Sequence, residues 1–304
     1  MSRSHWRLVV TVVGGLLLLS TGATAANAPR DRVPPRTPTI DGPLRPEVLR
    51  PIFTFGATDT QTPRARIRFR CGFDGAALRP CARIHRPAVA LSFGKHTLRA
   101  SAVDLAGNVS RSTTFAFTVA GSWDAARDFE RAPRPANPGR DRYGNTAWFY
   151  LYSVNPEHEP STYQLLPHFE VGQPGSESWR NRQGAGTGGT EIAYTFGRMV
   201  MHPGHYNLGQ NAVVGWRSPL AATVRVDADI STNPACEVPA NGVVWSIDHG
   251  AVTVKSGSLG LGQSTNRSFT VSVAAGESIF VVVNDAGDSN CDSTHVHLAI
   301  TTVD

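Results

Sequence analysis

Aromatic side chains occur at every second position of one short segment. If the segment forms a strand, Trp148, Tyr150 and Tyr152 lie on one face, because successive side chains of a strand point to opposite faces. A row of flat rings could stack on the C–H faces of a sugar while the polar ring tips meet water. The opposite face, with Ala147 and Leu151, is also apolar, which is typical of an inner strand covered on both sides. The segment is therefore either a platform for sugar rings or part of the core.

Three further aromatic residues lie outside such apolar runs. Trp179, Tyr194 and Tyr206 stand near glycine-rich or polar stretches. A ring at the border of a loop can be partly exposed, and an exposed ring with a polar tip suits contact with a hydrated ligand. These residues are the loop candidates for ligand binding, beside Trp148 and Tyr150 on the expected strand.

Two pairs of histidines are close together in the sequence. His295 and His297 point the same way if Val296 faces the core, and His202 and His205 form the second pair. Histidine is a common ligand of transition metals. However, the sequence has no His-Glu-x-x-His motif that would place two ligands on one helix face. We therefore expect surface or packed histidines, with a metal site as the alternative.

Three carboxylates crowd one loop beside a cysteine. Asp285, Asp288 and Asp292 lie in a stretch that also contains Gly and Asn. Oxygen ligands on a flexible loop suit Ca²⁺. The spacing differs from that of an EF-hand loop, and Asn241 stands where a fourth carboxylate could have served. The loop is a candidate structural calcium site, with a solvated turn as the alternative, and no other cofactor is expected.

The sequence has no motif that is typical of an active site. It contains no recognisable serine nucleophile elbow, no paired histidine and acid, and no pair of carboxylates that would flank a cleft. We therefore expect a protein that is not an enzyme and has no catalytic residues. A metal-dependent hydrolase or lyase that uses the histidines is the distant alternative.

The four cysteines fall into two pairs along the chain. Cys71 and Cys81 lie in the first half, and Cys236 and Cys291 lie in the second. Four cysteines allow three pairings. Pairing within each half avoids a cross-link between two independently folded units, so we expect one disulfide in each half. A zinc site is not expected because no C-x-x-C pair exists.

Residues 1–25 have the order of a secretory signal peptide. Arg3 and Arg7 precede the apolar run Leu8–Leu19, which Ala23-Thr24-Ala25 closes. The run has about 12 residues, fewer than the ~20 that a membrane-spanning helix needs. We therefore expect cleavage after Ala25, a secreted, extracellular mature chain and no membrane span, with an uncleaved anchor as the alternative.

The remaining composition favours many short strands joined by turns. The chain has 29 Gly and 21 Pro, 17% of its residues are charged, and few segments keep a helical period. We therefore expect an all-β protein. Alternation of apolar and polar residues predicts strands at residues 65–71, 97–103, 114–119, 223–230, 243–247, 269–273, 279–284 and 295–301.

The charge of the chain gives little reason to expect a nucleic-acid partner. The formal charge of +5 falls to +3 when Arg3 and Arg7 leave with the signal peptide. Nucleic-acid surfaces need clustered cations with interleaved aromatic residues. The nearest cluster, Arg64 to Arg70, alternates with apolar residues and fits the wet face of a strand, where like charges discourage edge-to-edge pairing. Anion binding by these arginines is the alternative.

The first half carries motifs of a known module. They are Phe69 to Gly75 (FRCGFDG), Pro80-Cys81, Gly94-Lys95-His96 and Ala102 to Asn108 (AVDLAGN). In this pattern the chain resembles the immunoglobulin-like modules of bacterial secreted and surface proteins. The resemblance implies a small β-sandwich that serves as a spacer or adhesive unit without catalytic residues. We place this domain at residues 38–120, after a Pro/Arg-rich linker at residues 26–37 that we expect to be extended.

The second half carries weaker motifs of another known module. They are His202-Pro203-Gly204, Val213 to Pro219 (VVGWRSP), Asn241-Gly242-Val243, Ala274 to Ile279 (AAGESI) and Asp292-Ser293-Thr294. In these stretches the chain resembles jelly-roll domains of the carbohydrate-binding-module type in bacterial secreted proteins. The chain departs from that pattern at Asn241 and Glu277, where the family often has Asp. The resemblance implies a jelly-roll-type β-sandwich over residues 121–304 and, by analogy only, glycan binding.

These observations lead to one functional hypothesis and two alternatives. We expect a secreted, non-catalytic binding protein that recognises an extracellular or cell-wall glycan through the C-terminal domain, with the immunoglobulin-like domain as spacer. The first alternative is a structural or adhesive cell-surface protein that binds other proteins. The second is the metal-dependent hydrolase or lyase considered above.

Overall fold

A computed structural model describes residues 30–303 of the chain, except 132–135, 154–158, 173–175, 184–188, 196, 205–209, 235–239 and 289. The expected signal peptide lies outside the described residues, as does the start of the expected linker. In the described part the protein is built almost entirely from antiparallel strands, so the all-β expectation is confirmed. No helix within these residues is both long and apolar enough to cross a membrane.

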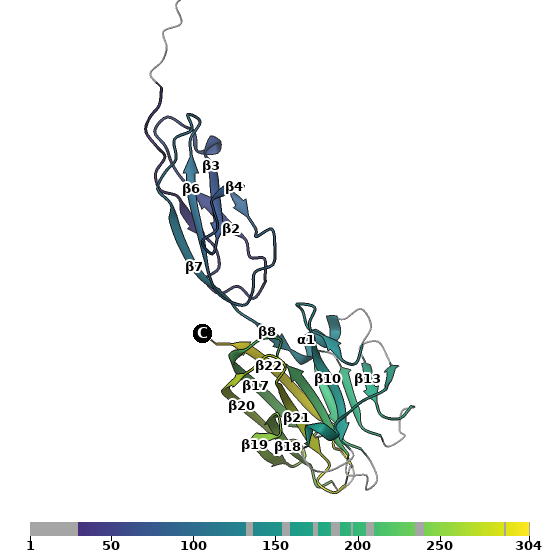
Figure 1. The fold of residues 1–304 in the computed structure, drawn as a ribbon. Coiled ribbons are helices and arrows are strands. Elements are labelled where there is room, and N and C mark those ends of the chain that lie inside the picture. The colour runs from purple at the N-terminus through teal and green to yellow at the C-terminus, as the bar shows by residue number, and fades with distance from the viewer. Residues whose placement is uncertain are drawn as a thin grey trace, which may run out of the picture.

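The described part of the first unit contains short strands and one 3-10 turn, shown in purple to teal in Figure 1. The elements are β1 (Thr39–Asp41), β2 (Phe53–Gly56), η1 (Arg64–Arg66), β3 (Arg68–Phe73), β4 (Arg79–Cys81), β5 (Ile84–His85), β6 (Gly94–Val103) and β7 (Thr113–Val119). The strands form two sheets with the orders β1-β2-β5 and β4-β3-β6-β7. Apolar residues of both sheets meet in one core, which makes this unit a small β-sandwich.

The core of the first unit follows the alternation that the sequence predicts. Leu98, Ala100 and Ala102 are fully buried along β6, and Phe117 and Val119 are buried along β7. One expected strand is wrong at its start, because residues 64–66 form η1 directly after Pro63 and β3 begins only at Arg68. Proline fixes its own φ and favours such a turn. The arginines of η1 and β3 are exposed, as expected of a wet face.

Part of the expected linker contacts the first unit. The backbone N–H of Arg36 donates to the Thr58 carbonyl oxygen at 2.9 Å. The amide nitrogen of Asn108 donates to the carbonyl oxygen of Asp31 at 3.1 Å. Residues 31–36 therefore lie against the sandwich instead of forming a free tether, because the turn that contains Asn108 supplies donors for their backbone.

The described part of the second unit is a larger sandwich, shown in teal to yellow in Figure 1. Its elements are β8 (Ser122–Asp124), α1 (Ala125–Arg131), β9 (Gly139–Arg140), β10 (Thr146–Ser153), η2 (Pro160–Thr162), β11 (Gln164–Leu165), β12 (His168–Val171), β13 (Ser176–Arg180), β14 (Glu191–Thr195), β15 (Arg198–His202), β16 (Asn211–Arg217), β17 (Ala222–Thr232), β18 (Val243–His249), β19 (Val252–Leu259), β20 (Ser264–Val273), β21 (Ser278–Asn284) and β22 (Thr294–Thr302).

Two sheets face each other across the core of this unit. One has the order β11-β10-β16-β21-β18-β19, with β9 beside β10, and the other has the order β12-β13-β14-β15-β22-β17-β20, with β8 beside β22. Every second residue of β17 from Val224 to Ile230 is fully buried, as the alternation predicted. These side chains meet Trp148, Val214 and Val281 of the opposite sheet. The sequence did not predict the short helix α1, whose Phe129 packs into the same core.

The two units touch where the chain passes from β7 to β8. Phe93 of the first unit packs its ring against Trp123 and Tyr143 of the second, with centroids 5.6 and 4.9 Å apart. The Tyr143 hydroxyl donates to the carbonyl oxygen of Glu47 at 3.0 Å. Arg45 donates to the carbonyl oxygen of Thr302. These contacts join both ends of the second unit's chain to the first unit.

Candidate ligand-binding site

The aromatic residues that the sequence singled out do not form an exposed platform. Trp148 and Tyr150 are buried, and only 7% of Trp179 and 8% of Tyr194 are exposed. Tyr206 lies outside the described residues. The expectation of exposed rings at Trp179 and Tyr194 is therefore wrong, because β13 and β14 lie inside the second sheet and turn these rings into the core.

The strand that carries Trp148 is an inner strand with apolar contacts on both faces. Trp148 pairs with Trp216 of β16 in the core between the sheets. On the other face, Leu151 packs in a separate cluster with Val213 and Phe280. Burial raises the pKa of the Tyr150 hydroxyl. The segment is therefore part of the core and not a platform for sugar rings.

A polar hollow instead opens on the outer face of the second sheet. It has a volume of about 360 Å³. It lies where β15, β22 and β17 run side by side, and most of its lining comes from side chains that project from the outer faces of these strands. The lining residues are Gly197, Arg198, Asp229, Ser231, His295, Val296 and His297.

Strand register brings the polar side chains of this hollow together. Asp229 is directly opposite His297 and Ser231 is directly opposite His295 in the pairing of β17 with β22. Both strands alternate, so the same register that buries Val296 and Ile230 turns these polar residues outward. The expectation that His295 and His297 point the same way is confirmed.

His297 lies between two carboxylates at the edge of the polar hollow. Its Nε2 is 3.0 Å from Asp124 Oδ2 and its Nδ1 is 3.5 Å from Asp229 Oδ2. The hydrogen bond that His297 donates to Asp124 is the largest of several influences that raise the pKa of His297. Burial alone would raise the pKa of Asp124, but its hydrogen bonds with His297 and with the backbone N–H of Arg127 lower it. The imidazolium form of His297 is thus favoured and ties β22 to β8.

His295 differs from His297 because one of its ring nitrogens has no partner within the described part of the chain. Burial, and then the charge of Arg198, lowers the pKa of His295 and favours the neutral ring. Its Nδ1 is buried and has no hydrogen-bond partner among the described residues. A neutral imidazole nitrogen can donate or accept one hydrogen bond. The polar hollow therefore offers Arg198 as donor, Asp229 as acceptor, and Ser231 and His295 as groups that can do either.

His202, the described member of the second histidine pair, does not form a possible metal-ligand group with the first pair. His202 Nδ1 is 2.7 Å from the carbonyl oxygen of Pro203, and His205 lies outside the described residues. Among the described residues, the groups of three or more side chains whose possible metal-ligand atoms lie within 4.8 Å of one another are Cys71–Cys81–His85 and Asp31–Asp59–Asp104. Neither group contains a residue of the polar hollow.

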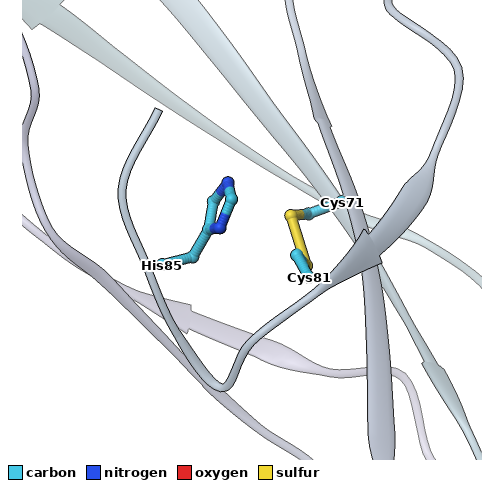
Figure 2. Close-up of side chains that lie close together, drawn as sticks. All are labelled: Cys71, Cys81 and His85. Atoms are coloured by element: carbon cyan, nitrogen blue, oxygen red, sulfur yellow. A yellow bond between two sulfur atoms is a disulfide. The ribbon is translucent and has the colours of Figure 1, made fainter. Parts of the chain in front are cut away.

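The cluster with two cysteines is a disulfide with a histidine beside it (Figure 2). Cys71 and Cys81 are bonded to each other, which confirms their expected pairing. Sulfur atoms in a disulfide are not thiolate ligands for a metal. His85 stacks on Phe55 and Phe73, and burial lowers its pKa. In the second half Cys291 is disulfide-bonded, and Cys236 lies outside the described residues, so their pairing stays a prediction.

A serine, a histidine and an acid meet in the first unit, but the histidine is already occupied. His96 Nδ1 is 2.7 Å from Asp74 Oδ2, and its Nε2 is 2.8 Å from the carbonyl oxygen of Ser92 and 3.5 Å from the Ser92 hydroxyl. A general base needs a free nitrogen that faces the nucleophile. The carbonyl oxygen takes that position here, so His96 joins the Asp74 turn to the start of β6.

The acidic group of the first unit is a set of turn contacts. Asp104 accepts two hydrogen bonds from Asn108, both at 2.7 Å, and Asp59 accepts from the backbone N–H groups of Gln61 and Thr62 at 2.9 and 2.7 Å. Both carboxylates thereby satisfy backbone groups of loops, as aspartate commonly does in turns.

The predicted calcium loop lies between β21 and β22. Asp292 is 0% exposed and Asp285 is buried, but the three aspartates are not among the groups of described residues whose ligand atoms all lie within 4.8 Å. Burial, followed by the charges of Asp288 and Asp285, raises the pKa of Asp292 to about 8. The structure therefore places three acidic groups near one another without bringing them all to one point, and calcium binding stays a prediction.

Sequence reasoning missed three of the polar side chains in the hollow. Arg198, Asp229 and Ser231 occupy outward positions of strands whose inward positions are apolar. That alternation is visible in the sequence of β17. The sequence does not show that β15 and β17 both lie beside β22, and this arrangement is what makes the hollow.

Comparison with known proteins finds similar arrangements of strands only in solved structures. The sequence matches no family model and no curated protein. One similar structure is the carbohydrate-binding module CBM51-2, in complex with GlcNAc, with the INT domains of ZmpB from Clostridium perfringens. The sequence identity is 11%, the alignment covers 86% of this chain and 48% of that chain, and the TM-score is 0.28.

Two other similar structures are also carbohydrate-binding modules. One comes from a study of promiscuous specificity in modules of the β-sandwich superfamily: 8% identity, 86% of this chain, 96% of that chain, TM-score 0.30. The other is a module of lichenase 5A from Cellvibrio mixtus in complex with cellotriose: 12% identity, 44% of this chain, 91% of that chain, TM-score 0.21. This chain spans about half of the first structure, and likeness at this level carries no argument about the site.

Proposed function

We propose that this protein is an extracellular, non-catalytic glycan-binding protein whose polar hollow on β15, β17 and β22 contacts the sugar. In this proposal residues 121–304 form the binding domain and residues 38–120 form a spacer. The observation that carries it is the convergence of Arg198, Asp229, Ser231 and His295 in one hollow. The secretory order of residues 1–25 supports the extracellular location.

The chemistry of the polar hollow suits a ligand with several adjacent hydroxyl groups. A sugar hydroxyl both donates and accepts, so it matches a lining that mixes a guanidinium, a carboxylate, a hydroxyl and a neutral imidazole. Charged hydrogen-bonding groups contribute about 1.5–3 kcal/mol each. The volume of about 360 Å³ is within the ordinary size of small-ligand pockets. Recognition would therefore depend on hydrogen bonds more than on ring stacking.

The non-catalytic part of the proposal is supported by the state of the histidines. His297 is held by two carboxylates, and the Nε2 of His96 in the first unit faces a carbonyl oxygen. Catalysis by His295 would require a nucleophile or a bound water positioned against its ring. Ser231 lies opposite His295 on β17, but within the described residues its hydroxyl forms no hydrogen bond with the ring. Release of reducing ends from a bound polysaccharide would overturn this part.

The test is a glycan array and a polysaccharide pull-down with the full chain and two matched pairs of variants. Asp229→Ala is paired with Asp227→Ala, because Asp227 projects from the same face of β17 but does not line the polar hollow. Arg198→Ala is paired with Arg225→Ala, because Arg225 projects from the outer face of the same sheet but does not line the polar hollow. Loss of one charged hydrogen bond should weaken binding about 10- to 100-fold in the first member of each pair. The second member should bind like the wild type.

Two outcomes would overturn the proposal in different ways. Equal binding by all four variants would place the sugar elsewhere on the molecule. Capture of no glycan at all would favour the structural or adhesive alternative, in which the second unit binds protein.

A further inference from the structure

The charge of the chain is divided unevenly between its two units. Residues 38–120 contain 12 Lys and Arg against five Asp and Glu, a formal charge of +7, whereas residues 121–304 contain 12 against 18, a formal charge of −6. A charged surface attracts partners of the opposite sign and speeds their association. The first unit is therefore the part of the chain that attracts an anionic partner.

Cations of the first unit gather on the outer face of one of its sheets. The strands of this sheet, β4, β3, β6 and β7, contain no Asp or Glu (Figure 1). The alternation that buries the core residues of β3 turns Arg68 and Arg70 outward, and the same alternation along β6 turns Lys95 and Arg99 to that side. Arg99 is half-buried and the other three are exposed. These four residues are the basic face.

Strand register arranges the basic face as a track along the sheet. Arg70 is directly opposite Ser101 in the pairing of β3 with β6, so it is a diagonal neighbour of Arg99, with the two Cα atoms about 7–8 Å apart. Arg68 lies opposite the last residue of β6, and Lys95 is the second residue of that strand. At about 3.3 Å per residue, these two positions are about 26 Å apart along β6. The track is therefore long enough to contact several units of an extended polymer.

No described carboxylate neutralises the basic face. Its four cations take part in no ion pair within the described residues. Protection of a sheet edge does not explain them either, because β3 and β6 are inner strands and each is paired on both sides. Like charges side by side on a sheet repel one another. An anionic partner would remove this repulsion.

A hollow of about 420 Å³ opens at one end of the basic face. Lys95, Thr97 and Thr118 line it from the outer face of β6 and β7. Asp74, the acid among its lining residues, is already bonded: its Oδ2 is 2.7 Å from His96 Nδ1, and its Oδ1 accepts from the backbone N–H of Thr97 at 2.9 Å. The hollow therefore offers an ammonium group and hydroxyl groups, which suit a ligand that is both acidic and rich in hydroxyls.

The side chains of this outer face favour one class of polyanion. The outward positions of β3, β6 and β7 carry no aromatic ring and no leucine or isoleucine, since the phenylalanines of these strands pack in the core. Single-stranded nucleic acids bind by stacking bases on aromatic rings, and membrane surfaces take up apolar side chains beside the cations. A carboxylated polysaccharide needs neither, because the guanidinium fork of arginine matches the two oxygens of a carboxylate.

We propose that the basic face binds a linear polysaccharide that carries a carboxylate on its repeating sugar. Arg68, Arg70 and Arg99 contact successive carboxylates along the track, and Lys95 contacts another at the hollow. This inference goes beyond the proposed function, in which the first unit is only a spacer. It uses none of the residues that line the polar hollow of the second unit.

The experiment compares two forms of one polymer that differ in charge. Binding of the full chain to polygalacturonate and to its neutral methyl ester is measured by biolayer interferometry at 50 and 200 mM salt. We expect polygalacturonate to bind at least tenfold more tightly than the ester. Its binding should weaken at least fivefold at the higher salt concentration, because salt screens exposed charges and reduces the gain from counterion release.

Variants assign the polymer to the basic face. Arg70→Gln and Arg99→Gln remove one charge each and should each weaken polygalacturonate binding about threefold, and the double variant should weaken it about tenfold. Arg86→Gln is the matched control, because Arg86 is exposed on the same unit and follows β5 of the other sheet. It should change the affinity less than twofold. Asp229→Ala, which alters the polar hollow, should bind polygalacturonate like the wild type.

Four results would overturn the inference. They are equal affinity for polygalacturonate and its ester, equal binding by the wild type and the double variant, the same loss in Arg86→Gln as in Arg70→Gln, and tighter binding of single-stranded DNA or phosphatidylglycerol vesicles than of polygalacturonate. If Arg99→Gln lowers Tm, Arg70→Gln decides the matter, because Arg70 is exposed. Loss of polygalacturonate binding in the double variant with glycan capture by the polar hollow intact, or the reverse in Asp229→Ala, separates this inference from the proposed function.

Discussion

Two buried aspartates of the second unit face opposite situations. Asp141, in the turn before β10, is 6% exposed and accepts four hydrogen bonds. Its donors are the indole of Trp123 at 2.7 Å, the backbone N–H groups of Tyr143 and Asn145 at 2.9 and 2.8 Å, and the Asn145 side chain at 2.9 Å. Asp292 is buried more completely and has no donor among the described residues.

The comparison teaches that burial by itself does not give the role of an acidic residue. Hydrogen bonds from surrounding donors offset the desolvation penalty of a buried carboxylate, and the same bonds stabilise the fold. For a buried carboxylate without donors that penalty is not offset within the protein, so a ligand from solution can offset it. Donor count therefore separates a structural acid from a candidate binding site. The following predictions test that separation, beginning with the largest effect.

The largest effect should come from removal of the satisfied acid. Asp141→Ala leaves the Trp123 indole and two backbone N–H groups without their acceptor, each at a cost of about 1–3 kcal/mol. We expect the free energy of unfolding to fall by about 3–5 kcal/mol, measured by urea denaturation. Asp227→Ala on the exposed face of β17 is the control and should change it by less than about 1 kcal/mol. A loss below about 1 kcal/mol in Asp141→Ala would contradict the structural role.

Asp128 is an intermediate case, with fewer donors than Asp141. It accepts from the Trp148 indole at 2.9 Å and from Arg127 Nε at 3.4 Å. Burial raises its pKa, although both contacts oppose the change. A raised pKa contributes stability below the unfolded value of 3.8, and that stability is lost as pH rises through the folded pKa.

The test of this case is Asp128→Asn, which removes the titration and keeps an acceptor for Trp148. The wild type should gain about 1 kcal/mol relative to the variant when the pH falls from 7 to 4. Urea denaturation at both pH values measures the difference. A difference that does not change with pH would show that Asp128 titrates normally in the folded protein.

Removal of the unsatisfied acid should have the opposite sign. In the presence of EDTA, Asp292→Asn removes a buried carboxyl group that accepts no hydrogen bond within the described residues and whose pKa is raised to about 8. We therefore expect the free energy of unfolding to stay constant or rise by about 1 kcal/mol. Asp141→Asn is the matched control and should lower it. A loss above about 2 kcal/mol in Asp292→Asn would mean that its carboxylate is stabilised within the protein.

The smallest effect should come from an exposed pair. His297 has a side chain that is 48% exposed and a raised pKa, owing first to its hydrogen bond with Asp124. Stability from this pair is present below the unfolded pKa of 6.5 and is lost as pH rises through the folded pKa. A double-mutant cycle of His297→Gln and Asp124→Asn should give a coupling below about 1 kcal/mol at pH 5.5 that fades by pH 8.5. Equal coupling at both pH values would contradict the raised pKa of His297 as the cause of the interaction.

The sequence predicted the parts of the fold in which local pattern and burial agree. Residues 223–230 alternate strictly, and β17 buries its Val and Ile side chains in that order. The pairing of Cys71 with Cys81 followed from their separation from the other two cysteines. The expected strand at residues 65–71 began too early, because the alternation of arginines continued through a turn that Pro63 initiates. Helix α1 has seven residues, too few to give a helical period, and was missed.

The sequence by itself determined which residues of a strand share a face, since that depends only on the twofold period of the strand. His295 and His297 were therefore placed together correctly. Only the tertiary structure decided which strands are neighbours and which faces are covered. For that reason the rings of Trp148 and Tyr150 went to the core, and Asp229 and Ser231 joined the histidines across β17 and β22. The burial of Asp292 among other carboxylates is likewise a property of packing between distant segments, which no local pattern encodes.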